Sequence, residues 1–243
     1  MSFFRRRQKP PEPTRPRLKQ AQASSWDVVV LAFKLLFPRI QFWIQANFWT
    51  VLFSLGLVTG PGAKAALHYT TAAGLRDPAG SEVNALKEMK IGFKRYFWKA
   101  LSLSIVKWFI FAVIAVSIYF WVAQDTWALR AVSIISIYGL VLWWLSSGYI
   151  YPILVDNPKQ SVFQVLKQAM LLAFNKPFPS LLFAVVSTLL MILGIALLGP
   201  VMLIIPVLRA ILMLQGYWFL TSREIPGFME IFEYANKHYD MKS

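Results

Sequence analysis

Long apolar runs alternate along the chain with short polar segments. A helix of about 20 residues, at 1.5 Å per residue, crosses the roughly 30 Å hydrocarbon core of a bilayer. The runs that meet this length cover residues 40–58, 100–122, 127–153, 177–198 and 201–220. Tryptophan and tyrosine gather near their ends, as is typical of the membrane–water interface. The pattern predicts an all-α, polytopic helical membrane protein with five long transmembrane helices.

A short return helix is expected between the first and second of these spans. Lysine and arginine concentrate on the cytoplasmic side of membrane proteins, and residues 76–99 are basic, as is the N-terminus. The chain must then cross back after residue 58. We predict a hairpin at Gly60, Pro61 and Gly62 that leads into a short helix over residues 62–76. Its small residues favour close helix packing in lipid, and a re-entrant loop covered by protein is the alternative.

Two further segments predict interfacial helices on the cytoplasmic leaflet. Residues 83–97 place apolar side chains on one helical arc and Lys87, Lys90 and Lys94 on the next, where lysines reach lipid phosphates. Residues 161–174 repeat the apolar pattern. Their likeness fits either an internal duplication or the shared needs of any surface helix that enters a bilayer. A tight outer turn is expected at Gly199 and Pro200.

The N-terminus predicts an extended basic arm. Its prolines disfavour a helix. We expect it to contact anionic membrane lipids or an acidic surface of a membrane-protein partner, and no nucleic acid, because a membrane anchor follows closely. The chain then divides into an arm (1–25), a single transmembrane domain (26–222) and a tail (223–243), with both termini cytoplasmic. The basic residues of the arm are Arg5, Arg6, Arg7, Lys9, Arg15, Arg17 and Lys19.

Composition narrows the function classes. The 243 residues are 57% hydrophobic and 15% charged, with a net charge of +14, which excludes an ordinary cytosolic enzyme and a disordered chain. There is no cysteine, and the two histidines leave little material for a metal centre. No nucleotide-binding or hydrolase motif occurs, and all 11 acidic residues lie outside the five apolar runs. We therefore expect a non-enzymatic protein without cofactor.

Residues 47–67 read Asn-Phe-Trp-Thr-Val-Leu-Phe-Ser-Leu-Gly-Leu-Val-Thr-Gly-Pro-Gly-Ala-Lys-Ala-Ala-Leu. The segment resembles the N-terminal signature of the YesL-like family, bacterial multi-spanning membrane proteins with a domain of unknown function. Gly56 stands where proline is usual in that signature, and the stretch before Gly60 is shorter. The resemblance implies a protein of the bacterial plasma (inner) membrane. It implies no established chemistry, although family members often accompany sugar-uptake permeases.

Arg209 is the most unusual residue, because it lies near the middle of the last apolar run. A charge there costs about 2.5–3.5 kcal/mol on insertion scales. It would serve an anionic ligand or a partner's carboxylate. Alternatively, carbonyls freed by Pro206, the side chains of Asn47 or Gln45, or lipid phosphate would satisfy it.

Two other polar residues in apolar surroundings are candidates for a site. Lys107 is expected to extend toward the inner interface and could also meet a ligand or partner. His68 is a weak candidate for a haem or chlorophyll ligand, against the commoner role of a hydrogen-bonded packing residue. The sequence thus supports two functions. The first is a non-enzymatic accessory or scaffold subunit of a larger membrane complex; the alternative is an accessory component of a solute transport system, possibly for carbohydrate.

Overall fold

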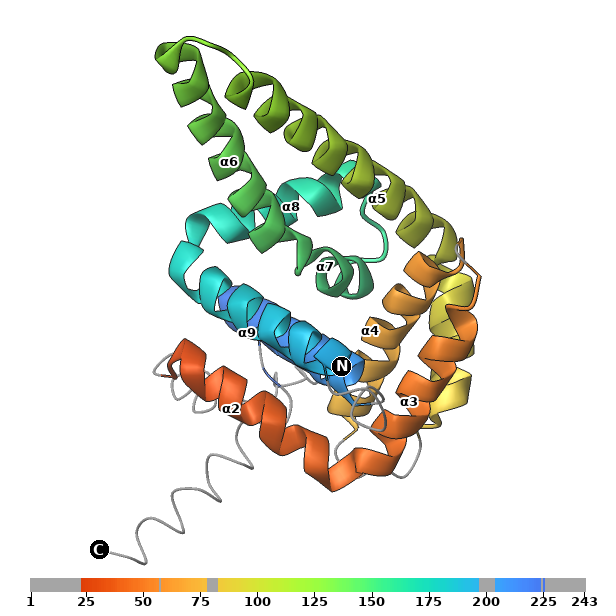
Figure 1. The fold of residues 1–243 in the computed structure, drawn as a ribbon. Helices are drawn as coiled ribbons and strands as arrows, with labels where there is room; N and C mark the ends of the chain where they lie inside the picture. Colours follow the sequence, from red (N-terminus) through yellow and green to blue (C-terminus); the bar gives the residue numbers. More distant parts are fainter. Residues whose placement is uncertain (1–22, 57, 78–82, 197–203, 224, 226–243) are drawn as a thin grey trace, which may run out of the picture.

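The structure is a computed structural model that describes residues 23–56, 58–77, 83–196, 204–223 and 225. Every element within these ranges is helical, which confirms the predicted all-α class (Figure 1). The basic residues of the arm, the expected turn at Gly199 and Pro200 and most of the C-terminal tail lie outside the described residues.

In the part of the chain that the structure describes, three helices are long and apolar enough to cross a membrane. They are α5 (Ala85–Val122), α6 (Trp127–Ser147) and α9 (Pro177–Ala196). The other two predicted spans are shorter as helices, since α3 is Ile40–Phe53 and α10 is Ile205–Leu220. The 14 residues of α3 cover only about 21 Å. Within the described residues, three of the five predicted spans are therefore helices of spanning length, and the other two are not confirmed.

α5 joins two elements that the sequence analysis separated. Residues 83–97 were expected to form an interfacial helix distinct from the span 100–122, but one helix of 38 residues covers both. Asn84 caps its start by accepting from the N–H groups of Leu86 and Lys87, and no proline interrupts the helix afterwards. Its apolar arc packs against protein, because Met89 and Tyr96 are buried. Lys87, Lys90 and Lys94 are exposed.

The predicted span 127–153 is broken instead of continuous. α6 ends at Ser147, and a separate short helix, α7 (Ile150–Asp156), follows. Pro152 explains the break, because a proline ring clashes with the carbonyl four residues earlier, here that of Gly148. Gly148 also lies against α10, since a Cβ at this position would come within 2.9 Å of Met213 Sδ.

A helix lies where the return helix was predicted. α4 (Gly60–Arg76) is buried along much of its length and packs against α3, α5, α7 and α10. Gly60, Pro61 and Gly62 form its first turn and not the preceding hairpin, because a proline without an N–H donor fits the first turn of a helix. At Gly92 of α5, a Cβ would lie only 3.1 Å from Ala66 Cα of α4, so this glycine permits the close crossing.

One helix was not anticipated. α2 (Ser25–Leu36) begins with a capping box, in which Ser24 Oγ accepts from Asp27 N–H and the Asp27 carboxylate accepts from Ser24 N–H. A short 3₁₀ turn, η1 (Phe37–Arg39), joins α2 to α3. The expected helix over 161–174 is present as α8 (Val162–Asn175), which also begins with a capping box, formed by Ser161 and Gln164.

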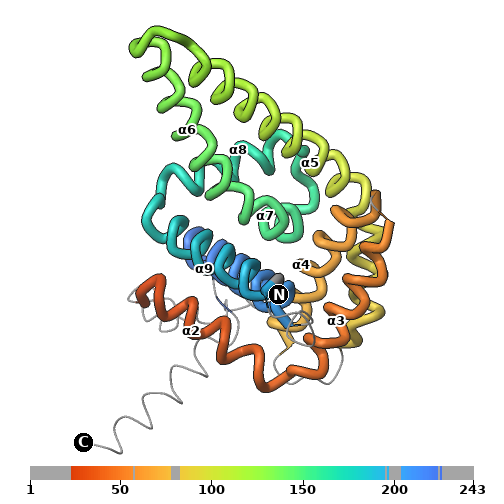
Figure 2. The backbone as a smooth tube through the Cα atoms, in the orientation of Figure 1, coloured from red at the N-terminus to blue at the C-terminus, as the bar shows by residue number. Residues whose placement is uncertain are grey.

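α10 is the most enclosed helix of the fold. Nearly all of its side chains are buried, and α2, α3, α4, α7 and α9 pack around it. By contrast, α5 and α6 form a long hairpin whose tip projects away from the other helices (Figure 2). The side chains near that tip are large, apolar and exposed, for example Trp127 at 82%. α10 is thus the axis around which polar side chains of several helices can meet.

Candidate functional site

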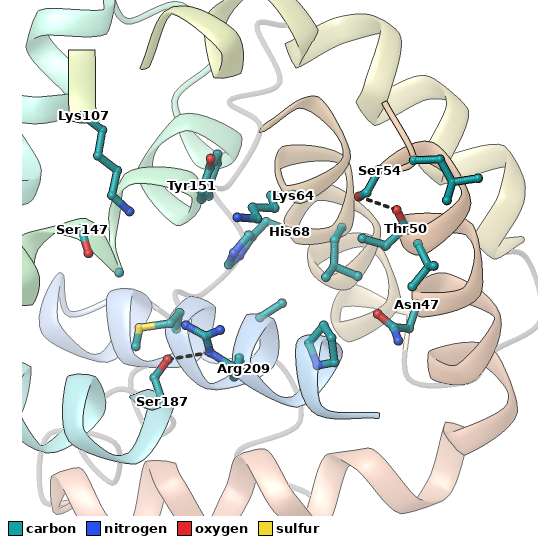
Figure 3. A pocket seen from close by; sticks show the side chains of 17 residues that line it. Asn47, Thr50, Ser54, Lys64, His68, Lys107, Ser147, Tyr151, Ser187 and Arg209 are labelled. Carbon is teal, nitrogen blue, oxygen red and sulfur yellow. Dashed lines mark hydrogen bonds between the residues drawn. The ribbon is translucent and has the colours of Figure 1, made fainter. Parts of the chain in front are cut away.

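A cavity of about 520 Å³ lies beside α10 (Figure 3). Its walls come from α3, α4, α5, α9, α10 and the junction between α6 and α7. Val51, Leu55, Leu67 and Met213 are among its apolar lining residues. The polar lining residues are Asn47, Thr50, Ser54, Lys64, His68, Lys107, Ser147, Tyr151, Ser187 and Arg209.

Three cationic side chains from three different helices line this cavity. They are Lys64 of α4, Lys107 of α5 and Arg209 of α10. No aspartate or glutamate is among the described residues of the lining. The three charges line the same space, so each lies in the electric field of the others. The cavity is therefore strongly electropositive, with no carboxylate among those lining residues to neutralise it.

Arg209 is half-buried, and a hydrogen bond to α9 orients it. Its Nε donates to Ser187 Oγ of α9 at 3.0 Å. Within the described part of the chain, its two Nη groups make no hydrogen bond to protein. Figure 3 shows the guanidinium at the cavity wall beside Ser187. A ligand oxygen in the cavity can thus accept from the Nη groups.

The structural partners expected for Arg209 are only partly found. Pro206 is in the first turn of α10, where its missing N–H leaves no carbonyl of the helix ladder unpaired. Gln45 is exposed and does not line the cavity, whereas Asn47 does. The contact that orients Arg209 is Ser187, which the sequence analysis did not name.

Lys107 extends into the cavity and not along α5 toward the inner interface. Figure 3 shows it pointing to the space between Ser147, Tyr151 and Lys64. This corrects the expectation of a lysine that reaches the helix end. Gly148 lines the cavity at the point where α6 ends and the chain turns into α7.

His68 faces the same cavity and stacks on an aromatic ring. Its imidazole lies 5.6 Å from the Tyr151 ring, centroid to centroid, with 16° between the planes. Its Nδ1 is buried and has no hydrogen-bond partner among the described residues. No group of three or more metal-ligating side chains lies together in the described ranges. The stacking makes His68 a wall of the cavity, where it can meet a bound ligand.

Hydroxyl groups on α3 and α6 give the cavity acceptors. Thr50 Oγ1 donates to Ala46 O at 2.8 Å, Ser54 Oγ donates to Thr50 O at 2.6 Å, and Ser147 Oγ donates to Trp144 O at 2.9 Å. Because each hydrogen is used within its own helix, the oxygen lone pairs remain for a ligand. The cationic wall offers donors and this wall offers acceptors.

The cavity lies at the middle of α9. Ser187 is ten residues from Pro177 and nine from Ala196, the two ends of that helix. At 1.5 Å per residue, it is about 15 Å from the start of α9. If α9 crosses a bilayer, Ser187 and Arg209 therefore lie near the centre of the hydrocarbon core.

Lys64 is the cation that the sequence analysis did not single out. It lies four residues before His68 in α4. A spacing of four places two helical side chains on one face. The spacing of four between Lys64 and His68 could therefore have indicated that both side chains belong to one site. Lys64 is also the exposed cation of the three, so the cavity is accessible on its side.

The end of the fold formed by α7 is held together by polar contacts. Asp156, with a side chain only 7% exposed, pairs with Arg76 at 3.2 Å and also with Arg223. Lys99 Nζ donates to the carbonyls of Pro158 and Gln160. These contacts connect the ends of α4, α7 and α10 to one another and the loop after α7 to Lys99 within α5.

No family model, no curated protein and no solved structure matches the chain. The resemblance of residues 47–67 to the YesL-like signature stays a prediction from the sequence. In the structure this segment covers the second half of α3 and the first half of α4. It supplies Asn47, Thr50, Ser54 and Lys64 to the cavity.

Proposed function

We propose that the protein binds an anionic solute in this cavity and serves as a component of a solute transport system. One observation carries the proposal. Three cations from α4, α5 and α10 face one cavity of about 520 Å³, and the described lining holds no carboxylate. The volume is within the roughly 300–1,000 Å³ typical of small-molecule sites.

The energetics favour a bound anion. A cation inside an apolar span costs about 2.5–3.5 kcal/mol on insertion scales. In addition, like charges repel more strongly where the local dielectric constant is low. Neither cost is offset by a protein carboxylate among the described lining residues. An anionic ligand offsets both the insertion cost and the repulsion, so the negative charge that the cavity lacks is supplied by the ligand.

The location is part of the proposal. We place the chain in the bacterial plasma membrane with both termini in the cytoplasm, from its charge distribution and the YesL-like resemblance. On this topology the loop between α5 and α6 is outside, and the ion pairs of Asp156 lie at the cytoplasmic end of the fold. Reporter fusions test it. Fusions after Gly80 and Asn157 should report the cytoplasm and a fusion after Asp125 the outside; the reverse result would reject this orientation.

Binding tests the proposal directly. The full chain is purified in a phosphate-free detergent, and its unfolding temperature is measured with organic anions and with neutral analogues of similar size. A ligand that binds only the folded state raises this temperature with concentration. We expect stabilisation by anions, loss of the effect in Lys107→Gln, and retention in Lys167→Gln. Lys167 is an exposed lysine of α8 outside the cavity, so it controls for charge removal. The absence of any anion effect would reject the proposal.

An accessory subunit of a larger membrane complex is the second candidate. The observation that favours it is the projecting hairpin of α5 and α6, which exposes large aromatic side chains such as Tyr119 and Trp108. Aromatic helix surface suits packing against another membrane protein as well as lipid. Purification in mild detergent tests it, because a stable partner in fixed stoichiometry would support it and a chain that purifies alone would oppose it.

A further inference from the structure

We infer that the anion bound in this cavity is a phosphate group, carried by a phosphate ester, and not a single carboxylate. The inference rests on the proposed function, because it names the ligand class of the same site. It follows from the number of charges in the cavity, the directions of its donors and the space that remains around them.

The charges favour a multivalent anion. Lys64, Lys107 and Arg209 bring three formal positive charges to one cavity. A carboxylate carries one negative charge, whereas a phosphate monoester carries about −1.5 to −2 at pH 7. A phosphate ester therefore neutralises more of the repulsion among the three cations than a carboxylate does.

The donors approach from three helices. Nε of Arg209 is held by Ser187, so its Nη groups form a fixed planar fork for two oxygens of one ligand. Lys64 and Lys107 supply single donors from α4 and α5, on other sides of the cavity (Figure 3). A tetrahedral phosphate has three terminal oxygens that point in different directions, but a carboxylate has only two, in one plane. The arrangement fits the tetrahedral group.

Space and acceptors remain for the rest of the ligand. The cavity of about 520 Å³ is much larger than a phosphate ion needs. The lone pairs of Thr50 and Ser54 lie on the α3 wall, next to the apolar side chains of Val51 and Leu55. An organic group with hydroxyl donors fits this wall. A soluble phosphate monoester has this chemistry, and phosphatidic acid, a phospholipid whose head group is a phosphate monoester, shares its charge.

Calorimetry with a matched pair of ligands tests the inference. Glycerol 3-phosphate and glycerate share a hydroxylated three-carbon frame and differ in the anionic group. Each is titrated into the full chain in lauryl maltoside, above the second phosphate pKa of about 6. We expect glycerol 3-phosphate to bind roughly 10-fold or more tightly than glycerate, since one further charge-assisted hydrogen bond is worth that factor. Equal affinities would overturn the phosphate inference and leave the proposed anion site standing.

A lipid arm of the experiment distinguishes the two sources. The protein is reconstituted in nanodiscs of phosphatidylcholine, with or without phosphatidic acid, and the titration with glycerol 3-phosphate is repeated. If phosphatidic acid abolishes the binding, the head group occupies the cavity. If the binding is unchanged, the ligand is a soluble ester. If neither glycerol 3-phosphate nor glycerate binds in micelles and phosphatidic acid does not raise the unfolding temperature, both this inference and the proposed function fail.

Variants assign the binding to the cavity. Arg209→Gln should weaken glycerol 3-phosphate binding roughly 10- to 150-fold, the worth of a hydrogen bond to a charged group. Arg209→Lys retains the charge without the fork, and its loss should be smaller. Lys107→Gln should also bind less tightly, while Lys167→Gln should match the parent. Thermal melts of each variant confirm folding. Unchanged affinity in both Arg209→Gln and Lys107→Gln would show that the phosphate binds elsewhere and would overturn the inference.

Discussion

Arg209 and Ser187 connect the two helices that run side by side through the fold, because Arg209 Nε on α10 donates to Ser187 Oγ on α9 at 3.0 Å. This contact fixes the plane of the guanidinium at the cavity wall. It leaves the hydroxyl hydrogen of Ser187 available for a second acceptor. The pair therefore acts as one unit, in which a serine of an uncharged helix orients a half-buried charge on its neighbour.

Ser187→Ala should weaken anion binding and leave the fold intact. The change removes the acceptor that orients Arg209, and a hydrogen bond of this kind corresponds to roughly a threefold to tenfold change in affinity. Titration with glycerol 3-phosphate measures it. Thr188→Val is the matched control, because the Thr188 hydroxyl donates to Ala184 O of its own helix. Equal losses in the two variants would argue against an orienting role for Ser187.

Arg209→Leu should unfold at the same temperature as the parent or higher. The variant removes a charge that costs about 2.5–3.5 kcal/mol in an apolar span, which offsets the roughly 1.5–3 kcal/mol of the hydrogen bond that it loses. Thermal melts in detergent without added anion test this. A lower unfolding temperature for Arg209→Leu, together with unchanged anion affinity, would mean that the guanidinium stabilises the fold and does not bind a ligand.

Gly92→Ala should destabilise the crossing of α4 and α5. The added Cβ would lie 2.8 Å from Tyr69 Cδ1 and 3.1 Å from Ala66 Cα, and the backbone of α4 cannot move aside freely. We expect a loss of about 1–3 kcal/mol, as for overpacked cores. Gly139→Ala in α6 is the control, because no atom lies within 4 Å of its added Cβ. That variant should gain up to about 1 kcal/mol from helix propensity. Equal unfolding temperatures for the two variants would contradict a close crossing of α4 and α5.

Asp156→Asn should loosen the end of the fold where α4, α7 and α10 meet. The carboxylate pairs with Arg76 and Arg223, but both arginine side chains are well exposed, at 57% and 44%. Water screens such pairs, so we expect a loss of about 1 kcal/mol that shrinks at high salt. Denaturant unfolding at two salt concentrations measures it, with Asp125→Asn in the exposed loop after α5 as control. A loss independent of salt would show that packing and not charge explains the effect.

The apolar runs of the sequence determined where most helices lie. Runs of sufficient length cannot be solvated as coil in a membrane, so helices in the places of α3, α5, α6, α9 and α10 follow from the pattern. The amphipathic spacing of residues 161–174 predicted α8. Small residues after Gly60 likewise indicated α4, because they allow neighbouring helices to approach closely. The sequence also holds local signals for the break after α6, at Pro152, and for the start of α2, at the Ser24–Asp27 capping box. A prediction based on hydropathy misses both, because it averages over the surrounding residues.

Single residues of the site were also visible in the sequence. Arg209, Lys107 and His68 attracted notice because a polar group in an apolar run carries an energetic cost that some contact must offset. Their meeting in one cavity was not visible. Hydropathy cannot tell a face that contacts lipid from a face that contacts another helix, since both surroundings are apolar. Only the packing of α3, α4 and α9 around α10, and of α5 against α4, brings residues from Asn47 to Arg209 to one cavity, and this packing decided that Lys64 and Ser187 belong to the site.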